Sequence, residues 1–337
     1  MLAVLTLGLV SLVIAVGIGS VRIPADTVVE VVRAKVFGPA DSAVAPHVTQ
    51  IIWDLRLPRV ILAALVGAGL SLVGVAVQAL VRNPIADPYV LGVSSGASIG
   101  AAAVIVYGSA LGLGMLGLSG AAFLTATVSM ALVYLVARRG RAGLDPLRLV
   151  LTGVVAGYVL SALTSYLVFL GDPRGAQQVL FWLLGSFERA RWSTLALPAL
   201  VLGVVLAWLL IRARAMDALL AGDEAAVTLG VPVVRVRLEL FVATAALTAV
   251  MVAVSGAVGF VGLVVPHIVR VLVGALHRRL LVGSALFGAA FMVWVDLAAR
   301  TVASPQEIPV GILTALVGGP LFLYLMSRRD RQLDGAR

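Results

Sequence analysis

Few side chains in this sequence have the types and spacing that catalysis needs. The segment GVSSG at 92–96 has the Gly-x-Ser-x-Gly spacing of a nucleophile elbow. That elbow requires a preceding strand and later acid and base partners. Here the segment lies in an apolar, helix-like stretch, and His267 and His277 are the histidines that follow it. Chance spacing among many glycines and serines explains the match better, so we predict that this chain is not an enzyme.

The sequence also lacks the usual signatures of nucleotide and metal sites. Lys35, the single lysine, is not part of a Gly-Lys-Ser/Thr sequence, which excludes a P-loop in this chain. The absence of cysteine excludes disulfides and thiolate metal sites. His267 follows Pro266 in an apolar span and could relay protons or bind a metal, but no second ligand lies at suitable spacing. We interpret it as bonded to a neighbouring helix, place His47 and His277 in loops, and expect no metal site and no cofactor.

The amino-acid composition indicates whether water or lipid surrounds these residues. Of 337 residues, 61% are hydrophobic and only 12% are charged, whereas soluble domains carry about 25% charged residues. So long and apolar a chain cannot hide its surface from water, and we expect lipid to surround much of it. The net charge is +9, but the arginines lie between apolar spans. This pattern indicates membrane topology rather than nucleic-acid binding.

Apolar runs of membrane-spanning length define the elements. A membrane helix needs about 20 apolar residues. Two of the runs are long enough for two helices each, because glycines interrupt them near 108–120 and at 255–256. The sequence therefore predicts an all-α membrane protein with about ten transmembrane helices. The runs are 1–21, 60–81, 88–137, 149–171, 192–211, 240–269, 280–295 and 308–327, and the helix in the second part of 240–269 can continue through Arg270 to Leu276.

The basic residues give these helices an orientation. With ten spans and both termini in the cytoplasm, 16 basic residues lie inside and 9 outside, whereas the acidic residues divide 8 and 8. A cationic bias without an anionic one is what the positive-inside rule predicts. The start of the chain lacks a basic leader region and a small-residue cleavage site, so residues 1–20 predict a first membrane helix rather than a signal peptide.

Two loops are predicted to contain short helices and so to be more than simple connections between spans. Residues 22–57, on the predicted outside, contain an amphipathic stretch at 27–36 that predicts a short surface helix. Residues 213–237, on the predicted inside, contain two short helical stretches at 216–220 and 224–229. Gly222 separates them, Asp223 could cap the second helix, and Gly230 and Pro232 end it. Such a knob either docks in a partner or is an ordinary connector. Gly96/Gly100 and Gly153/Gly157 have the spacing of close helix contacts.

Eight distinctive motifs follow one another along the chain. They are LRLPR (55–59), QALVRNPIADP (78–88), LGVSSG (91–96), WLLGS (182–186), GDEAAVTLGVP (222–232), GAVGFVGLVVPHIVR (256–270), DLAAR (296–300) and EIPVG (307–311). In this order they resemble the FecCD/cobalamin-type permeases of bacterial ABC importers, and the resemblance covers nearly the whole chain. It implies the type II importer fold in a single permease domain, 1–337, with the segment 213–237 as a cytoplasmic coupling loop.

The resemblance also implies partners and a location. A second permease subunit, either another copy or a paralogue, would complete the path through the bacterial inner membrane. Two ATP-binding subunits would hold ATP and Mg, and an extracytoplasmic protein would deliver the cargo. The chain itself would then be a conduit with separate energy-supplying subunits.

Three groups of residues receive roles from the resemblance. Arg56, Arg59 and Arg300 match outer arginines that dock the binding protein, although helix-end arginines reaching for the interface are the alternative. Asn83 and Ile85 match the narrowing of the path on the cytoplasmic side. The residues expected to couple the permease to the ATPase are Gly222, Asp223, Glu224, Ala225, Thr228, Leu229, Gly230 and Pro232.

The cargo suggested by this family is an iron–siderophore complex, with haem or cobalamin as the alternative. The segment 187–192, near the predicted outer mouth, could tune the choice of cargo or partner, or could be a surface loop. A protein of another class, an ATP-independent channel or secondary carrier, is less well supported. Coupled carriers usually place carboxylates in the middle of their spans, and no predicted span has one there.

Overall fold

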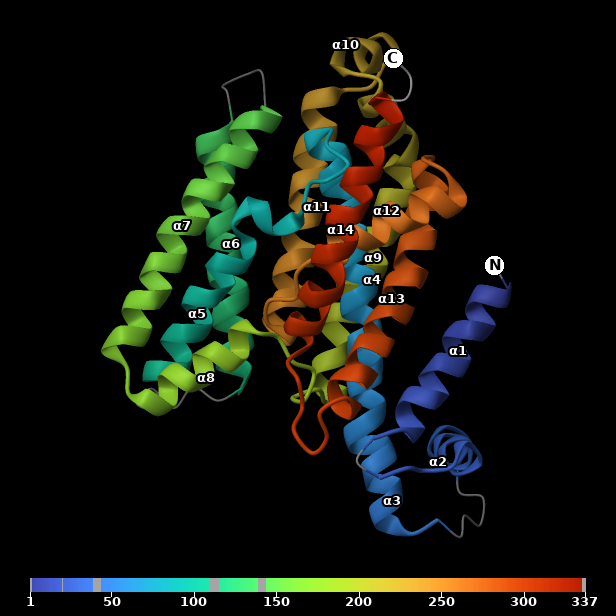
Figure 1. Cartoon of the computed structure of the whole chain (residues 1–337). Coiled ribbons are helices and arrows are strands. Elements are labelled where there is room, and N and C mark those ends of the chain that lie inside the picture. Colours follow the sequence, from blue (N-terminus) through green and yellow to red (C-terminus); the bar gives the residue numbers. More distant parts are fainter. Residues whose placement is uncertain (1, 20, 39–43, 109–114, 139–143, 335–337) are drawn as a thin grey trace.

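The computed structural model describes residues 2–19, 21–38, 44–108, 115–138 and 144–334. The regular elements in these residues are helices (Figure 1). In chain order they are α1 (Leu2–Gly17), α2 (Ala25–Phe37), α3 (Pro46–Gln50), η1 (Ile51–Arg56), α4 (Leu57–Val81), η2 (Pro88–Leu91), α5 (Val93–Tyr107), α6 (Met115–Ala137), α7 (Pro146–Leu170), α8 (Pro173–Leu183), α9 (Trp192–Leu220), α10 (Asp223–Thr228), α11 (Val233–Ser255), α12 (Val261–Val273), α13 (His277–Thr301) and α14 (Val310–Asp334).

The helices confirm the predicted fold class of an all-α membrane protein. In the described residues, six helices are long and apolar enough to cross a membrane, beginning at Pro46, Gly117, Pro146, Trp192, Val233 and His277. Three shorter apolar helices, α5, α12 and the start of α14, coincide with other predicted spans. Helix α1 corresponds to the first predicted span, so each of the ten predictions has a helix.

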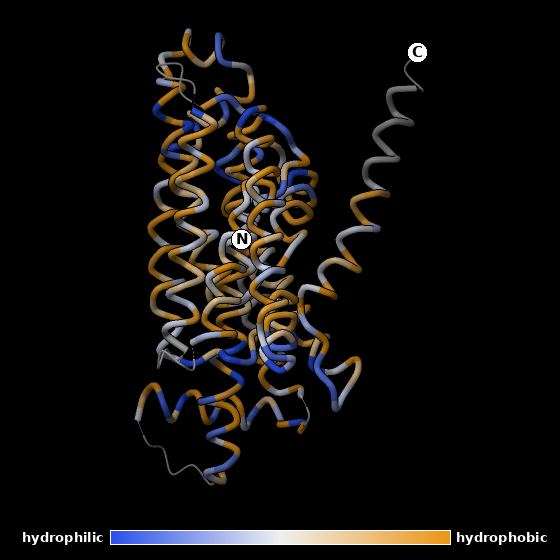
Figure 2. Tube along the Cα trace, turned by 90° about the vertical axis from the view of Figure 1, so that its left-hand side faces the viewer, coloured by the Kyte–Doolittle hydropathy of each residue, from blue (hydrophilic) through white to orange (hydrophobic). Residues whose placement is uncertain are grey.

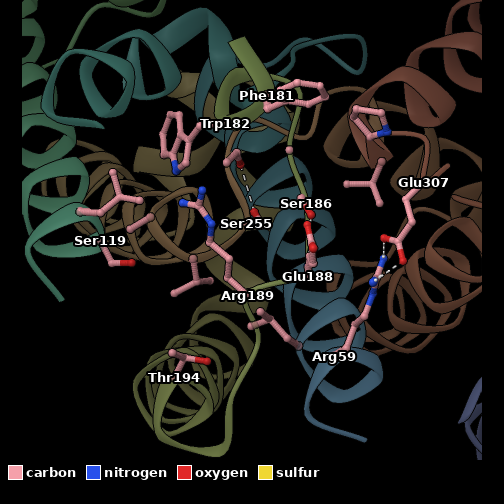
Figure 3. Close-up of a pocket in the computed structure, with 18 of the residues that line it drawn as sticks. Arg59, Ser119, Phe181, Trp182, Ser186, Glu188, Arg189, Thr194, Ser255 and Glu307 are labelled. Carbon is pink, nitrogen blue, oxygen red and sulfur yellow. Dashed lines mark hydrogen bonds and ion pairs between the residues drawn. The ribbon is translucent and has the colours of Figure 1, made fainter. Parts of the chain in front are cut away.

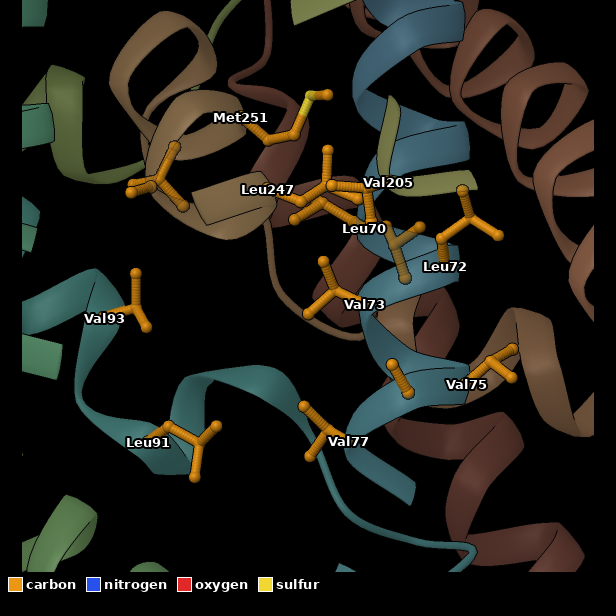
Figure 4. Close-up of a cluster of buried hydrophobic side chains, with 14 of the residues drawn as sticks. Leu70, Leu72, Val73, Val75, Val77, Leu91, Val93, Val205, Leu247 and Met251 are labelled. Carbon is orange, nitrogen blue, oxygen red and sulfur yellow. The ribbon is translucent and has the colours of Figure 1, made fainter. Parts of the chain in front are cut away.

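Helix α4 is the centre of the molecule, and nearly all of its residues are buried. It packs against α9, α11, α12 and α13. Figure 4 shows Leu70 and Val73 of α4 beside Leu247 and Met251 of α11 and Val205 of α9. A helix that is apolar on every side is stable in this position because neighbouring helices, rather than water, surround it.

The start of α4 continues directly from α3 through a π-helical turn, η1. Pro58 explains the turn, since it has no N–H to donate and its ring crowds the preceding carbonyls. A wider turn relieves this crowding, and the N–H of Leu57 bonds to the carbonyl of Ile52, five residues earlier.

Close packing around α4 depends on glycine. A Cβ atom on Gly67 would collide with the backbone of Gly288 in α13, and one on Gly74 would collide with the backbone of Gly262 in α12. The predicted glycine pair in α5 is also a true contact, because Cβ atoms on Gly96 and on its partner four residues later would meet α6. Small residues allow backbones to approach where lipid provides no hydrophobic drive for association.

The bundle has two distinct ends, which we call the α10 end and the α8 end after the short helices that lie there (Figure 1). Helices α5, α6 and α7 form a group on one side of α4, and α2, α3 and α8 lie at the α8 end. Figure 2 shows hydrophobic residues along the helices and hydrophilic residues gathered towards both ends. Helix α2 confirms the predicted short helix in the first loop.

Helices α7 and α14 are among those that leave large apolar surfaces uncovered within this single chain. On α7, Tyr158 and Phe169 are exposed, and on α14, Leu316 and Leu323 are exposed. Helix α14 makes its contacts with α12 and α13, and Figure 2 shows it leaning away from the bundle. Uncovered apolar faces of this kind contact lipid or another subunit.

Candidate functional site

The predicted knob at 213–237 contains one short helix rather than two. Residues 216–220 are the last turn of the long helix α9, which corrects the prediction of a separate helix there. Apolar positions recur through this turn, and buried Met216 and Leu219 extend the packed face of α9. The second predicted helix is α10. Gly222 and Gly230 adopt φ values of +106° and +77° on either side of it, a conformation that glycine adopts without steric cost.

Helix α10 turns its apolar side chains outwards. Val227 and Leu229 are 62% and 70% exposed, whereas Ala226 faces the protein and is buried. Glu224, Thr228 and the following Pro232 are exposed, and Ala225 is half-buried. The hydroxyl of Thr228 donates to the carbonyl of Glu224 within the helix. The predicted coupling residues therefore form a small projection with an uncovered apolar tip.

Asp223 does not cap α10 with its side chain as predicted; Gly222 occupies the cap position. Instead, Asp223 Oδ1 accepts a hydrogen bond from Arg237 Nη2 at 2.7 Å and lies 3.3 Å from Arg82 Nη1. Arg237 is in α11 and Arg82 ends α4. Sequence patterns did not predict these pairs, because Arg82, Asp223 and Arg237 belong to three different elements whose packing is not visible in the sequence.

The predicted narrowing, Asn83 and Ile85, lies in the turn that follows α4 at the α10 end. Arg82 has the left-handed φ of +53°, and the N–H of Asn83 bonds to the Gln78 carbonyl. The Asn83 side chain accepts the N–H of Ile85 at 3.1 Å. Both predicted residues are exposed in the single chain, with Ile85 at 39%. They are thus available to a partner or to a path between subunits.

The turn continues into a half-buried anchor that no sequence motif predicted. Asp87 accepts the N–H of Tyr89 at 2.8 Å and caps η2. The Tyr89 hydroxyl accepts the N–H of Val258 and donates to its carbonyl. These contacts fix the turn between α4 and α5 to the backbone that joins α11 and α12.

His277 is not the loop residue that we predicted. It begins α13, is 2% exposed, and its Nδ1 lies 2.6 Å from Asp217 Oδ1. The same carboxylate oxygen accepts the backbone N–H of His277 and so caps the helix. His267, by contrast, is half-buried in α12. Among the described residues, no group of His, Asp and Glu side chains has the arrangement of a metal site.

At the α8 end, the three predicted docking arginines are buried, with exposures of 8–9%. The expectation of exposed outer arginines is therefore wrong. Arg59 Nε donates to fully buried Asp296 at 2.9 Å, and its two terminal nitrogens bind Glu307 at 3.1 and 2.8 Å. Asp296 also contacts Arg300 Nε at 3.1 Å, as their spacing on one helix face predicts.

Arg56 and Arg300 hold the end of α1. Helix C-termini leave carbonyl groups without intrahelical partners. Arg56 donates to the carbonyls of Val16, Gly17 and Val21, and Arg300 donates to those of Ala15 and Ile18. These side chains have structural partners in this chain, and hydropathy could not reveal that they point inwards.

A cavity of ≈ 410 Å³ opens beside Arg59 at this end. Figure 3 shows Arg59 and Glu307 joined on one side of it, and Arg189 directed towards Trp182 on the other. Phe181, Glu188, Ser119 and Ser255 also line it. Among the described residues, Arg189 makes none of the recorded ion pairs.

The segment 187–192 is therefore part of a cavity wall and not only a surface loop. Phe187 is fully buried, while Glu188 and Arg189 line the cavity. At its end, the Trp192 ring lies 4.7 Å from that of Trp53, and its Nε1 donates to the Trp53 carbonyl. The cavity offers aromatic surface and groups of both charges, and so suits a large organic molecule or a partner's side chains.

The comparisons with known proteins fit this arrangement. Residues 6–328 match the FecCD transport family. The cobalamin import system permease protein BtuC of Halobacterium salinarum is 44% identical over 86% of this chain and 76% of its own length. The hemin transport system permease protein HmuU of Yersinia pestis is 40% identical over 84% of this chain and 85% of its own.

A solved structure shows the same fold over nearly the whole length. It is an inward-facing conformation of a metal-chelate type ABC transporter, which is 33% identical and covers 97% of this chain and 98% of its own, with a TM-score of 0.83. The helices, the motif order and these matches agree. The chain is a multi-pass ABC transporter permease that belongs to the FecCD transport family.

Proposed function

We propose that this permease imports an organic metal chelate, with an iron–siderophore complex as its cargo, across the bacterial inner membrane. The observation that carries the proposal is the projection of α10, whose apolar tip is uncovered next to the 82–88 turn. A permease needs an exposed surface that an ATPase subunit can contact, because ATP-driven movements of that subunit must reach the permease. ATP and Mg would be held by that subunit, and this chain would supply the path.

The α10 end is assigned to the cytoplasm. Most basic residues lie on that side of the predicted topology. In Figure 1, α1 runs from its N-terminus towards the α8 end, and α14 runs from the α8 end towards the α10 end. In this proposal both termini lie inside, and the cavity beside Arg59 faces outwards. Two ATP-binding subunits would then contact two copies of α10.

The uncovered faces of α7 and α14 supply the contact for a second permease subunit, either a copy of this chain or a paralogue. Their exposed aromatic and aliphatic side chains suit an apolar interface within the membrane. Pairing across these faces would bring two 82–88 turns, with Asn83 and Ile85, to one path.

The external binding protein would dock at the α8 end. Of the three arginines assigned to docking, Arg59 is best placed, because its partner Glu307 is 43% exposed at the side chain and a carboxylate from the binding protein could reach the same surface. Arg56 and Arg300 would support docking indirectly, because they fix the end of α1 below the docking surface. Exposed Arg189 and Glu188 extend the surface around the cavity mouth.

Haem or cobalamin is the second candidate cargo, favoured by the similarity to HmuU and BtuC. All three cargoes combine a metal with a large organic ligand, as does the cargo class of the metal-chelate type transporter. The cavity, with Trp182 and Phe181 beside Arg189, is compatible with aromatic and anionic parts of such molecules.

Reconstitution tests the proposal directly. The permease, its ATPase and its binding protein are placed in liposomes, and uptake of a ferric siderophore, hemin and cobalamin is measured with and without ATP. ATP-dependent accumulation of the siderophore supports the proposal, and preference for hemin or cobalamin supports the second candidate. Uptake that is unchanged without ATP would instead indicate a channel or secondary carrier.

Deletion of residues 223–229 tests the role of α10. We expect uptake to stop and ATP hydrolysis to lose its dependence on the binding protein and cargo. A matched control shortens a loop at the opposite end, by deleting the exposed residues 303–304, and should keep ATP-dependent uptake. Normal uptake after deletion of α10 would contradict the assignment.

A further inference from the structure

The contacts of Asp223 join two features that the sequence places far apart: the α10 projection and the 82–88 turn. We propose that Asp223 is a positioning residue that transmits movement of α10 to the turn carrying Asn83 and Ile85, through its ion pair with Arg82. This inference rests on the proposed function, because it identifies how the ATPase contact would reach the path.

Arg237 anchors Asp223 on one side. Its side chain is only 7% exposed, and its Nη2 donates to Asp223 at 2.7 Å. Its Nη1 lies 3.5 Å from the Leu144 carbonyl, and its Nε is buried without a hydrogen-bond partner among the described residues. A buried guanidinium needs an opposite charge, so Asp223 cannot move away without leaving that charge uncompensated. The start of α10 is therefore fastened to α11.

Arg82 completes the link on the other side. It pairs with the same oxygen, Asp223 Oδ1, at 3.3 Å, and its side chain is 38% exposed. The Arg82–Asp223 pair is longer and more exposed to solvent than the Arg237–Asp223 pair. It is therefore the ion pair of this cluster that can break and re-form at a low cost in free energy.

The backbone of Arg82 supports this assignment. Arg82 has φ of +53°, one of two left-handed non-glycine residues in the described part of the chain. Such a conformation is sparsely populated and persists where surrounding contacts fix it. The side-chain pair with Asp223 is one of those contacts. A shift of α10 would release or tighten it, and Asn83 follows directly in the chain.

Glu30 provides a matched control. It is an exposed acidic residue of α2, at the opposite end of the bundle (Figure 1) and outside the coupling loop. Unlike Asp223, it takes part in none of the ion pairs recorded among the described residues. Its replacement by Gln therefore changes the net charge of the protein by the same amount without removing the link.

The first experiment measures ATP hydrolysis and cargo uptake together in liposomes containing the full transporter. Because semi-exposed pairs contribute little free energy, Arg82→Gln should lower the amount transported per ATP by about threefold. Asp223→Asn also leaves Arg237 unpaired and should lower it by about tenfold. Arg82→Lys, which keeps the charge, and Glu30→Gln should both transport normally.

The double variant decides between a link and two separate effects. If Asp223 acts on the turn through Arg82, adding Arg82→Gln to Asp223→Asn should cause no further loss. Losses that multiply, normal coupling in Asp223→Asn, or an equal loss in Glu30→Gln would each overturn the proposal.

A second experiment tests the link without transport. The chain has no cysteine, so Ile85→Cys introduces a unique thiol whose labelling rate can be measured in the isolated permease. Adding Asp223→Asn should change that rate at least threefold, and adding Glu30→Gln should leave it unchanged. An unchanged rate with Asp223→Asn overturns the link. If the unmodified transporter shows no ATP-dependent uptake, the proposed function fails, and this measurement still decides whether Asp223 controls the turn.

Discussion

Replacing Asp296 by Asn should destabilise the protein far more than replacing Glu307 by Gln, although both carboxylates bind Arg59. Asp296 is fully buried and serves Arg59 and Arg300, which are themselves 9% and 8% exposed. Removing one partner from a buried ion pair costs about 3–5 kcal/mol, because the remaining charge stays buried. Glu307 is 43% exposed at the side chain, and loss of such a pair costs at most about 1 kcal/mol.

These free energies can be converted into melting temperatures. An unfolding entropy of about 2.1 cal/mol/K per residue gives about 0.7 kcal/mol/K for a chain of this length. Asp296→Asn should then lower the midpoint by about 4–7 °C and Glu307→Gln by less than about 2 °C. The midpoints are measured by tryptophan fluorescence in one detergent and lipid mixture, with equal protein concentrations. Similar unfolding midpoints for the two variants would refute the reasoning that burial of the carboxylate decides how much stability is lost.

Three further predictions concern packing and docking. Gly74→Val should prevent accumulation of folded protein in membranes, because its side chain would collide with the backbone of Gly262; expression as a fluorescent fusion measures this, and normal yield would contradict it. Tyr89→Phe should destabilise the protein by about 1–3 kcal/mol, because both backbone groups of Val258 lose their partner; thermal melting checks this, and an unchanged midpoint would show that water replaces the hydroxyl. Leu229→Asp should change the melting temperature by no more than about 1 °C, since that side chain is 70% exposed. The same variant should weaken binding of the ATPase subunit in a pull-down assay. Retained binding would argue against docking at α10.

The helices were predictable because lipid imposes a simple rule on sequence. Each apolar run of suitable length became a helix, and the glycine interruption near Gly256 separates α11 from α12. Helix ends were less predictable, since the final turn of α9 continues beyond the apolar run while Met216 and Leu219 still find a packed surface.

Side-chain partners could not be predicted from local patterns. His277 pairs with Asp217, which is 60 residues away in the chain, so nothing near either residue reveals the contact. Polar residues near span ends can face solvent, lipid headgroups or another helix end. Arg59 matched a motif expected to face outwards, yet buried Asp296 lies within reach and orients its guanidinium inwards.

The capping of α1 has a consequence for the order in which the chain assembles. Arg56 lies 40 residues beyond the carbonyl of Val16 that it binds, whereas Arg300 lies 285 residues beyond that of Ala15. During synthesis, α1 therefore gains its first cap when η1 has been made, but receives its second cap only when α13 is complete. Ribosome-bound intermediates of this permease should thus carry an α1 that is still free to change its neighbours until α13 has been inserted.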